Sequence, residues 1–161
     1  MKLFSSSYST PLGKIKIQCT NTHLVSASFM DTDENLIDDL HPILEDTIPQ
    51  LSAYFEGKLR TFNIPIWQDG TEFQKKVWDL LYAIPYGKTI SYQDLAKQYG
   101  DIKAIRAVAA ANGKNDIAII IPCHRVIGSD RSLTGYAGGL WRKKWLLDHE
   151  AKFYSGVQQL F

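Results

Sequence analysis

The chain has 161 residues, the length of one ordinary domain or of two small ones. Hydrophobic residues make up 45% and charged residues 22%, which is typical of a globular protein and excludes a disordered tail. No apolar run approaches the roughly 20 residues of a transmembrane helix, the N-terminal residues lack the apolar stretch of a secretory signal, and two cysteines cannot build a disulfide framework. We therefore expect a cytoplasmic protein with reduced thiols and no membrane partner.

The net charge of +1 hides opposite charges in the two halves of the chain. Residues 1–71 carry 5 Lys and Arg against 9 Asp and Glu, whereas residues 72–161 carry 13 against 8. The balances of −4 and +5 indicate that the second half meets a polyanion. Chance segregation of charges on two solvated surfaces explains the same numbers equally well.

The first half predicts strands around one helical segment. Three runs have a strand pattern: residues 14–19, 23–29 and 59–66. Between about 35 and 57 apolar residues recur at helical spacing, and Pro42 and Pro49 interrupt the pattern. The turn-rich residues that follow at 67–70 predict a domain boundary, so that the domains span 1–70 and 71–161.

The second half has sharper helix signals. Thr71 with Gln74 and Ser91 with Asp94 have the spacing of capping boxes, and Asp101 is placed to cap a further helix over 103–112. Two short helices joined by a tight, Gly-containing turn predict a helix-turn-helix. The elements expected next are a buried strand, a Gly-containing hairpin or wing, and a final helix, at 117–121, 128–139 and 140–149.

The predicted helix over 103–112 has few long polar side chains. Ala107, Ala110 and Ala111 give it a nearly bald face, beside which Arg106 projects. Recognition helices read the major groove with long polar side chains, so a bald face favours the minor groove, with Arg106 in that groove or in the base stack. Alternatively the alanines pack against the core, and the helix taken alone favours this second interpretation.

Cys123 is the candidate nucleophile, although a lone cysteine after an apolar run is usually a core residue. His124 is an available base and Glu150 an available partner to orient it. Neighbours in an extended segment point to opposite sides, so a water or a bend would have to link the thiol to His124. A zinc site built from these two residues with Cys19 and His23 lacks any familiar spacing, so we expect no metal.

Six segments of the second half form a specific pattern: FQKKVW at 73–78, IPYGKTISY at 84–92, RAV at 106–108, IPCHRV at 121–126, GYAGGL at 135–140 and LLDHE at 146–150. With these segments the chain resembles the O6-alkylguanine-DNA alkyltransferases, also called methylated-DNA–protein-cysteine methyltransferases. The resemblance covers about residues 72–150, and the first half fits the family only in size and strand–helix outline.

The resemblance implies an α+β fold with two domains. The N-terminal domain would be a small antiparallel sheet with a helix, of ribonuclease H-like type, and the C-terminal domain a winged helix-turn-helix. The implied activity is DNA repair: an irreversible, single-turnover transfer of an alkyl group from O6-methylguanine, and from O4-methylthymine, to Cys123 without a cofactor. The implied partner is double-stranded DNA, bound by a monomer through the minor groove.

The resemblance also implies roles for single residues. Cys123 would accept the alkyl group, and His124 (through a water), Glu150 and Asn115 would form the network that activates it. Tyr92 would sit beside the flipped base and form a hydrogen bond at N3.

The base pocket and the DNA surface are implied in the same way. Backbone carbonyls of Cys123 and Val126 would hold the exocyclic amine, and Tyr136 and Ala137 would form the loop over the base, with the Ala137 N–H near O6. Arg106 would fill the gap in the base stack. The residues expected to contact DNA are Arg106, Ala107, Ala110, Ala111, Arg125 and Ser129.

Two positions depart from the family pattern, since Asp116 replaces a common Pro after Asn115 and Arg131 replaces a common Gly in the wing. We expect these changes to affect rate and DNA affinity rather than activity itself. Two rival functions stay open: a DNA-binding regulator or lesion sensor without chemistry, and a cysteine hydrolase that turns over repeatedly.

Overall fold

The computed structural model describes residues 2–32, 34 and 36–155, which form two compact units. The first unit extends to Gln68 and takes in Asp116–Ala118, and the second holds Asp69–Asn115 and continues from Ile119. In the part of the chain that the structure describes, no helix combines the length and the apolar character that crossing a membrane requires.

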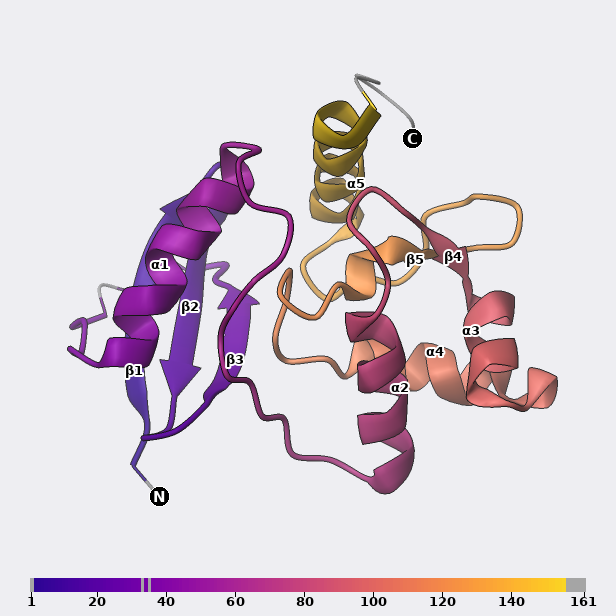
Figure 1. The fold of residues 1–161 in the computed structure, drawn as a ribbon, viewed down its shortest axis with the longest axis horizontal. Helices are drawn as coiled ribbons and strands as arrows, with labels where there is room; N and C mark the ends of the chain where they lie inside the picture. The colour runs from indigo at the N-terminus through magenta and orange to yellow at the C-terminus, as the bar shows by residue number, and fades with distance from the viewer. Residues whose placement is uncertain (1, 33, 35, 156–161) are drawn as a thin grey trace. The chain divides into compact units, whose positions relative to one another are not determined.

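The first unit is an antiparallel sheet of three strands with one helix. Its elements are β1 (Phe4–Thr10), β2 (Gly13–Cys19), β3 (Leu24–Phe29) and α1 (Pro42–Phe55). The strand order is β1-β2-β3, and α1 packs along β1 and β2, as Figure 1 shows. Every second residue of β2 is buried from Ile15 to Cys19, because these side chains alternate between the two faces of the sheet.

The strand predictions for 14–19 and 23–29 are confirmed, whereas the strand predicted for 59–66 is wrong. That segment buries Phe62 and Ile64 in an alternating pattern but pairs with β3 only through the bridge of Ile66 to Leu24. The alternating apolar pattern of residues 59–66 therefore reflects burial of side chains and not pairing in a β-sheet. Strand β1 was not predicted, because its serine-rich sequence lacks the alternation of apolar residues that indicated β2 and β3.

Helix α1 begins later than the helical pattern suggested. Pro42 occupies the start of the helix instead of interrupting it, since the first turn needs no N–H there, and the His41 ring caps the end by accepting from the Ile43 N–H. Pro49 lies inside the helix.

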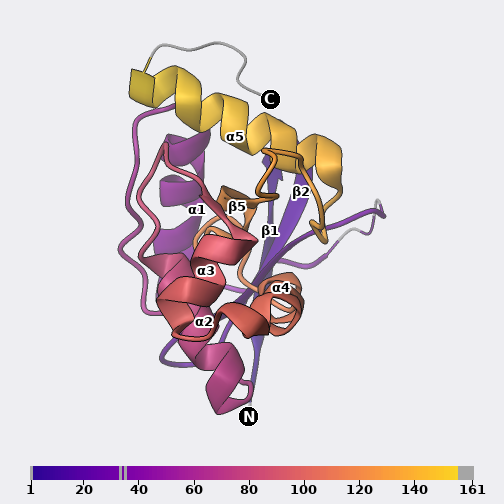
Figure 2. The same ribbon diagram turned by 90° about the vertical axis from the view of Figure 1, so that its right-hand side faces the viewer.

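The second unit consists of three packed helices, a two-stranded parallel sheet and a long last helix. Its elements are α2 (Glu72–Tyr82), β4 (Ile90–Ser91), α3 (Tyr92–Tyr99), η1 (Ile102–Ala104), α4 (Ile105–Gly113), η2 (Cys123–Arg125), β5 (Val126–Ile127) and α5 (Leu140–Ser155). Helices α2, α3 and α4 contact one another pairwise, and Figure 2 shows them grouped together. The indole N–H of Trp78 on α2 donates to the Ala111 carbonyl at 2.9 Å and ties two of them together.

Both predicted capping boxes are present, with reciprocal hydrogen bonds at Thr71–Gln74 and Ser91–Asp94. Helix α3 ends at Gly100, whose φ of +108° is the left-handed conformation that glycine adopts freely, and α4 follows after the short turn η1. The predicted helix-turn-helix is therefore α3 and α4.

The strand predicted for 117–121 is wrong. Only Ile117 forms a bridge, to Ala27, and the chain then turns, with Ile119 at φ +72°. The four isoleucines of this segment are all buried, so its apolar run reflects burial without sheet pairing. The expected wing at 128–139 is a loop without a strand of its own, and β5 pairs with β4 in parallel.

Candidate active site

Cys123 begins the turn η2 and is 7% exposed. Its backbone N–H donates to the Ile121 carbonyl at 2.8 Å, and the Arg125 N–H donates to the Pro122 carbonyl at 3.0 Å. In an extended segment, as expected from the sequence, the side chains of Cys123 and His124 would point to opposite sides. A 3-10 turn instead rotates successive side chains by about a third of a turn, so the structure supplies the bend that linking the two side chains required.

His124, Arg125 and Glu150 form a buried charged network. His124 Nε2 lies 2.7 Å from Glu150 Oε2, while Arg125 Nε and Nη2 donate to the two carboxylate oxygens at 2.8 and 3.1 Å. Arg125 Nη1 also donates to the Ile84 carbonyl at 2.6 Å. The exposed fractions of His124 and Glu150 are 0% and 1%, so these contacts form out of water.

The network fixes the protonation of its members. Burial alone would raise the pKa of Glu150, but the charges and hydrogen bonds of His124 and Arg125 outweigh burial and lower it. Burial lowers the pKa of His124 in spite of Glu150. A neutral His124 must therefore donate from Nε2 to the ionised carboxylate, which leaves Nδ1 with a lone pair. Nδ1 is buried and has no hydrogen-bond partner among the described residues, so it can accept a proton.

The Cys123 thiol is protonated at rest. Burial raises its pKa, and a hydrogen bond from Asn115 and the positive charge of Lys143 lower it in part. The Asn115 side-chain amide also donates to the Ile121 carbonyl at 2.9 Å, which orients it beside the segment that ends in Cys123. A thiol in this state needs a base before it can act as a nucleophile.

An open pocket of about 510 Å³ lies between α3, α4 and the loop that precedes α5. It is lined by Tyr92, Ile105, Arg106, Ala109, Gly113, Thr134, Gly135, Tyr136 and Ala137. Cys123 and Val126 are not among the lining residues. Burial raises the pKa of Tyr92 and of Tyr136, and a negative charge on the Cys123 sulfur raises both further. Both tyrosines of the pocket therefore lie within electrostatic reach of the sulfur.

Two tyrosines line this pocket. The Tyr92 hydroxyl donates to the Thr134 carbonyl at 3.0 Å, and the Tyr136 hydroxyl is buried with no hydrogen-bond partner among the described residues. Burial raises the pKa of Tyr136 well above its ordinary value. Both phenols are therefore neutral and can donate a hydrogen bond to a bound molecule.

Sequence reasoning missed Lys143, whose side chain is fully buried. Its Nζ donates to the Val126 carbonyl at 2.6 Å and to the Thr134 carbonyl at 2.8 Å, and burial lowers its pKa to about 8. A signal existed, because Lys143 and Glu150 are seven residues apart and therefore share one face of a helix.

The structure places the expected DNA-contacting residues in two groups. Arg106, Ala107, Ala110 and Ser129 are exposed, as a binding surface requires. Ala111 is 2% exposed and packs toward α2, so it belongs to the core side of its helix.

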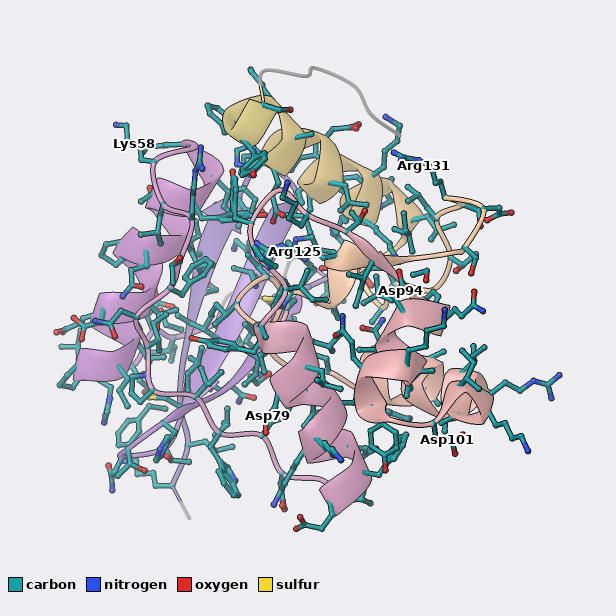
Figure 3. The ribbon with its side chains drawn as sticks, turned by 45° about the vertical axis from the view of Figure 1, so that its right-hand side comes forward. Lys58, Asp79, Asp94, Asp101, Arg125 and Arg131 are labelled. Atoms are coloured by element: carbon teal, nitrogen blue, oxygen red, sulfur yellow. The ribbon has the colours of Figure 1, made fainter. Side chains whose placement is uncertain are left out.

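Arg125, which was also expected to contact DNA, is buried. It is 5% exposed, and its guanidinium donates to Glu150 and to the Ile84 carbonyl. Figure 3 shows Arg125 surrounded by other side chains. We therefore reassign Arg125 from DNA contact to the active-site network.

The zinc alternative gains no support from the described residues, among which no cluster of three or more His, Cys, Asp and Glu could hold a metal ion. Cys19 is fully buried in β2, and burial raises its pKa.

Family models match both halves of the chain. The ribonuclease-like domain of the 6-O-methylguanine DNA methyltransferases matches residues 3–68, and their DNA binding domain matches residues 72–152. A methylated-DNA–protein-cysteine methyltransferase of Methanosarcina acetivorans is 40% identical over 92% of this chain and 98% of its own. The constitutive Bacillus subtilis protein of that name is 43% identical over 90% and 93%.

Solved structures agree with these relatives. An O6-methylguanine methyltransferase of Mycobacterium tuberculosis is 38% identical and superposes over 94% of both chains with a TM-score of 0.85. A further structure, of Mycobacterium tuberculosis OGT in complex with DNA, is 40% identical and covers 91% of this chain and 92% of its own with a TM-score of 0.83. The resemblance and the α+β fold predicted from the sequence are confirmed. The relatives that match this chain are named methylated-DNA–protein-cysteine methyltransferases. The chain therefore belongs to the 6-O-methylguanine DNA methyltransferase family.

Proposed function

We propose that this protein transfers an alkyl group from O6-alkylguanine, and from O4-methylthymine, in double-stranded DNA to its own Cys123, once per molecule. DNA repair by alkyl transfer is the activity of the family to which the chain belongs. The observation that carries the proposal is the buried pair of His124 and Glu150, which follows Cys123 on the turn η2 and leaves Nδ1 as a proton acceptor.

The reaction begins with the proton of Cys123. It passes to His124 Nδ1 through a water, and the ionised Glu150 stabilises the imidazolium that forms. Asn115 and Lys143 stabilise the thiolate. The sulfur then attacks the methyl carbon opposite the guanine oxygen, so that the S–C bond forms as the C–O6 bond breaks. The electron pair of the broken bond goes to the departing guanine.

The pocket holds the base while this happens. Tyr92 donates a hydrogen bond to N3 and so stabilises the negative charge that develops on the leaving base, and the Ala137 N–H lies near O6. The Val126 carbonyl, together with that of Cys123, accepts from the exocyclic amine. Tyr136 covers the base from the loop. Because the resulting thioether has no proton to lose and no good leaving group, the protein is spent after one transfer.

DNA reaches this site through the second unit. A base stacked in duplex DNA blocks the approach of the sulfur, so it must be extruded into the pocket, at a cost of a few kcal/mol. The exposed Arg106, which lines the pocket, fills the gap in the stack, and Ala107 and Ala110 let α4 approach the minor groove closely. We propose that the protein does this as a monomer in the cytoplasm.

Mass spectrometry of the intact protein tests the proposal. After mixing with duplex DNA that contains O6-methylguanine, the protein should gain one methyl group in place of one hydrogen, and peptide mapping should place it on Cys123. Cys123→Ser is the control, because a serine hydroxyl is far harder to ionise at this site. It should bind the same DNA and gain nothing.

The rival functions give different results in the same experiment. A lesion sensor without chemistry leaves both the protein and the DNA unchanged. A hydrolase releases more demethylated DNA than there is protein. A parallel reaction with O4-methylthymine tests that substrate separately.

A further inference from the structure

Asn112 stands out among the buried polar residues of the second unit because no role described so far uses it. It is 3% exposed and lies near the C-terminal end of α4, one turn beyond the pocket residue Ala109 and directly before the pocket residue Gly113. Its Oδ1 is buried with no hydrogen-bond partner among the described residues. A carbonyl oxygen buried in this way costs stability, so packing alone would favour an apolar residue here.

The other end of the Asn112 amide faces the active site. Its side chain forms a hydrogen bond with the Tyr92 hydroxyl. Because Oδ1 has no partner among the described residues, the amide nitrogen is the donor and the phenol oxygen the acceptor. The Tyr92 proton points the other way, to the Thr134 carbonyl on the pocket wall. The phenol is thus held between a donor on α4 and an acceptor on the loop before α5.

This arrangement decides what Tyr92 can offer to a bound base. A phenol oxygen that already accepts a hydrogen bond from Asn112 presents its proton to the pocket. A donated hydrogen bond also polarises the phenol and makes its own O–H a stronger donor. Thr134 lines the pocket and accepts from Tyr92 in the free protein, so a ring nitrogen of a base in the pocket can take over that proton.

We propose that Asn112 is a positioning residue that holds Tyr92 as a hydrogen-bond donor toward the base during alkyl transfer. The inference rests on the proposed function and adds a residue that acts through Tyr92 without touching the reacting atoms. It predicts that losing the Asn112 amide slows the chemical step and leaves DNA binding intact.

The test is a double-mutant cycle in single-turnover kinetics with duplex DNA that contains O6-methylguanine. The variants are Asn112→Leu, Tyr92→Phe and the double variant. Asn112→Leu keeps the volume of the side chain and removes both hydrogen-bonding ends. We expect the transfer rate constant at saturating DNA to fall about five- to tenfold, as for one net hydrogen bond, with the Kd for DNA unchanged. In the Tyr92→Phe background the same change should slow transfer less than twofold.

A matched control separates positioning from stability. Val108 is fully buried on the same helix and is not in the pocket lining, so Val108→Ala destabilises α4 without removing the amide. It should lower the melting temperature and keep the transfer rate constant. The split between rate constant and Kd in Asn112→Leu decides the question even if Tyr92→Phe is very slow.

Three results would overturn the inference: an unchanged rate constant in Asn112→Leu, an equal loss in both Tyr92 backgrounds, or a loss that Val108→Ala reproduces. Failure of the proposed function looks different. In that case the wild-type protein itself transfers no methyl group to Cys123, and the inference falls with it.

Discussion

A single buried carboxylate, that of Glu150, connects three separate segments of the second unit. It accepts hydrogen bonds from His124 and Arg125 on the turn η2 and from the Gly87 N–H at 3.4 Å, in the segment between α2 and β4. Removing one member of such a pair leaves a charge buried without a partner. The stability of the protein should therefore depend on the ionisation of this one group.

Glu150→Gln should lower the free energy of unfolding at neutral pH by about 3–5 kcal/mol, because Arg125 loses its countercharge. It should also make the free energy of unfolding depend less on pH in the acid range. The folded pKa of Glu150 lies below its ordinary value of 4.5, so the unfolded chain takes up the proton first as pH falls. The contribution of Glu150 is fully present above that ordinary value and is lost as pH falls toward the folded pKa.

Urea unfolding from about pH 7 down to about pH 2 measures this difference. Asp148→Asn is the matched control, since Asp148 lies on the same helix but pairs with Lys144 in a partly exposed contact at 2.6 Å. Asp148→Asn should change the free energy of unfolding and its dependence on pH only slightly. Parallel profiles for wild type and Glu150→Gln would show that Glu150 titrates alike in the folded and unfolded chain.

Arg131 occupies a strained turn in the loop after β5. Its φ is +68°, its N–H donates to the Gly128 carbonyl at 2.9 Å, and Asp130 Oδ1 accepts from the Ser132 N–H at 3.0 Å. The backbone at Arg131, where the family commonly has glycine, is therefore in the left-handed conformation. A non-glycine residue adopts it at a cost of roughly 1–2 kcal/mol.

Arg131→Gly should raise the free energy of unfolding by about 1 kcal/mol, since the strain disappears while the unfolded chain gains freedom. If the exposed guanidinium contacts a DNA phosphate, the same change reduces the magnitude of the log–log salt slope of DNA binding by about 1. Lys58→Ala is the control: it removes a cation of the first unit, labelled in Figure 3, and should leave the salt slope unchanged. An unchanged slope in Arg131→Gly would mean that Arg131 reaches no phosphate.

At the scale of elements, the capping box of α3 positions Tyr92. Ser91 accepts from the Asp94 N–H at 2.9 Å, and Tyr92 is the first residue of the helix that this bond begins. Thr71 makes the equivalent bond to the Gln74 N–H at 3.1 Å at the start of α2. The two boxes have the same geometry, but only that of α3 carries a residue of the pocket.

Ser91→Ala and Thr71→Ala should each lower the free energy of unfolding by about 1 kcal/mol, because each loses one cap. Only Ser91→Ala should also slow methyl transfer, because the frayed first turn no longer holds Tyr92. Chemical denaturation and single-turnover kinetics on both variants check this. Equal transfer rates in the two variants would show that Tyr92 is held by its contacts with Thr134 and Asn112 alone.

The capping boxes also show which elements could be predicted from the sequence. A cap is a local interaction within four residues, so its spacing is visible in the chain, and α2 and α3 begin where it indicated. Burial was visible too, as in the isoleucines after residue 116 and in the segment before Ile66. Whether a buried segment joins a ladder depends on distant partners, and both of these segments were wrongly expected to be strands.

The residues of the site can likewise be separated into those that the sequence identified and those that only the structure revealed. The family motif identified Cys123, His124 and Glu150, and the last two lie in contact across 26 positions of sequence. The buried ion pair of Arg125 and the two carbonyl contacts of Lys143 need three-dimensional neighbours to be seen, because an arginine or a lysine in a basic half of a chain is otherwise assigned to DNA.

At the scale of the whole molecule, the reaction changes the protein permanently. Cys123 lies in a packed site, with the buried His124 next to it and a hydrogen bond from Asn115 to its sulfur. A methyl group on that sulfur adds volume where close packing leaves little room, and the thioether is a poorer acceptor for the Asn115 amide. Overpacking of this kind costs about 1–3 kcal/mol.

The methylated protein should therefore melt at a lower temperature than the unmodified one, by about 2–10 °C if the full range of cost is taken. Calorimetry on protein that has reacted with methylated DNA and been freed from it measures the shift, and Cys123→Ser carried through the same treatment controls for handling. Hydrogen exchange locates the loss, which should lie at η2 and along α5 near Glu150, because these elements hold the network around the sulfur. An unchanged or higher melting temperature would mean that the pocket accepts the added methyl group without strain.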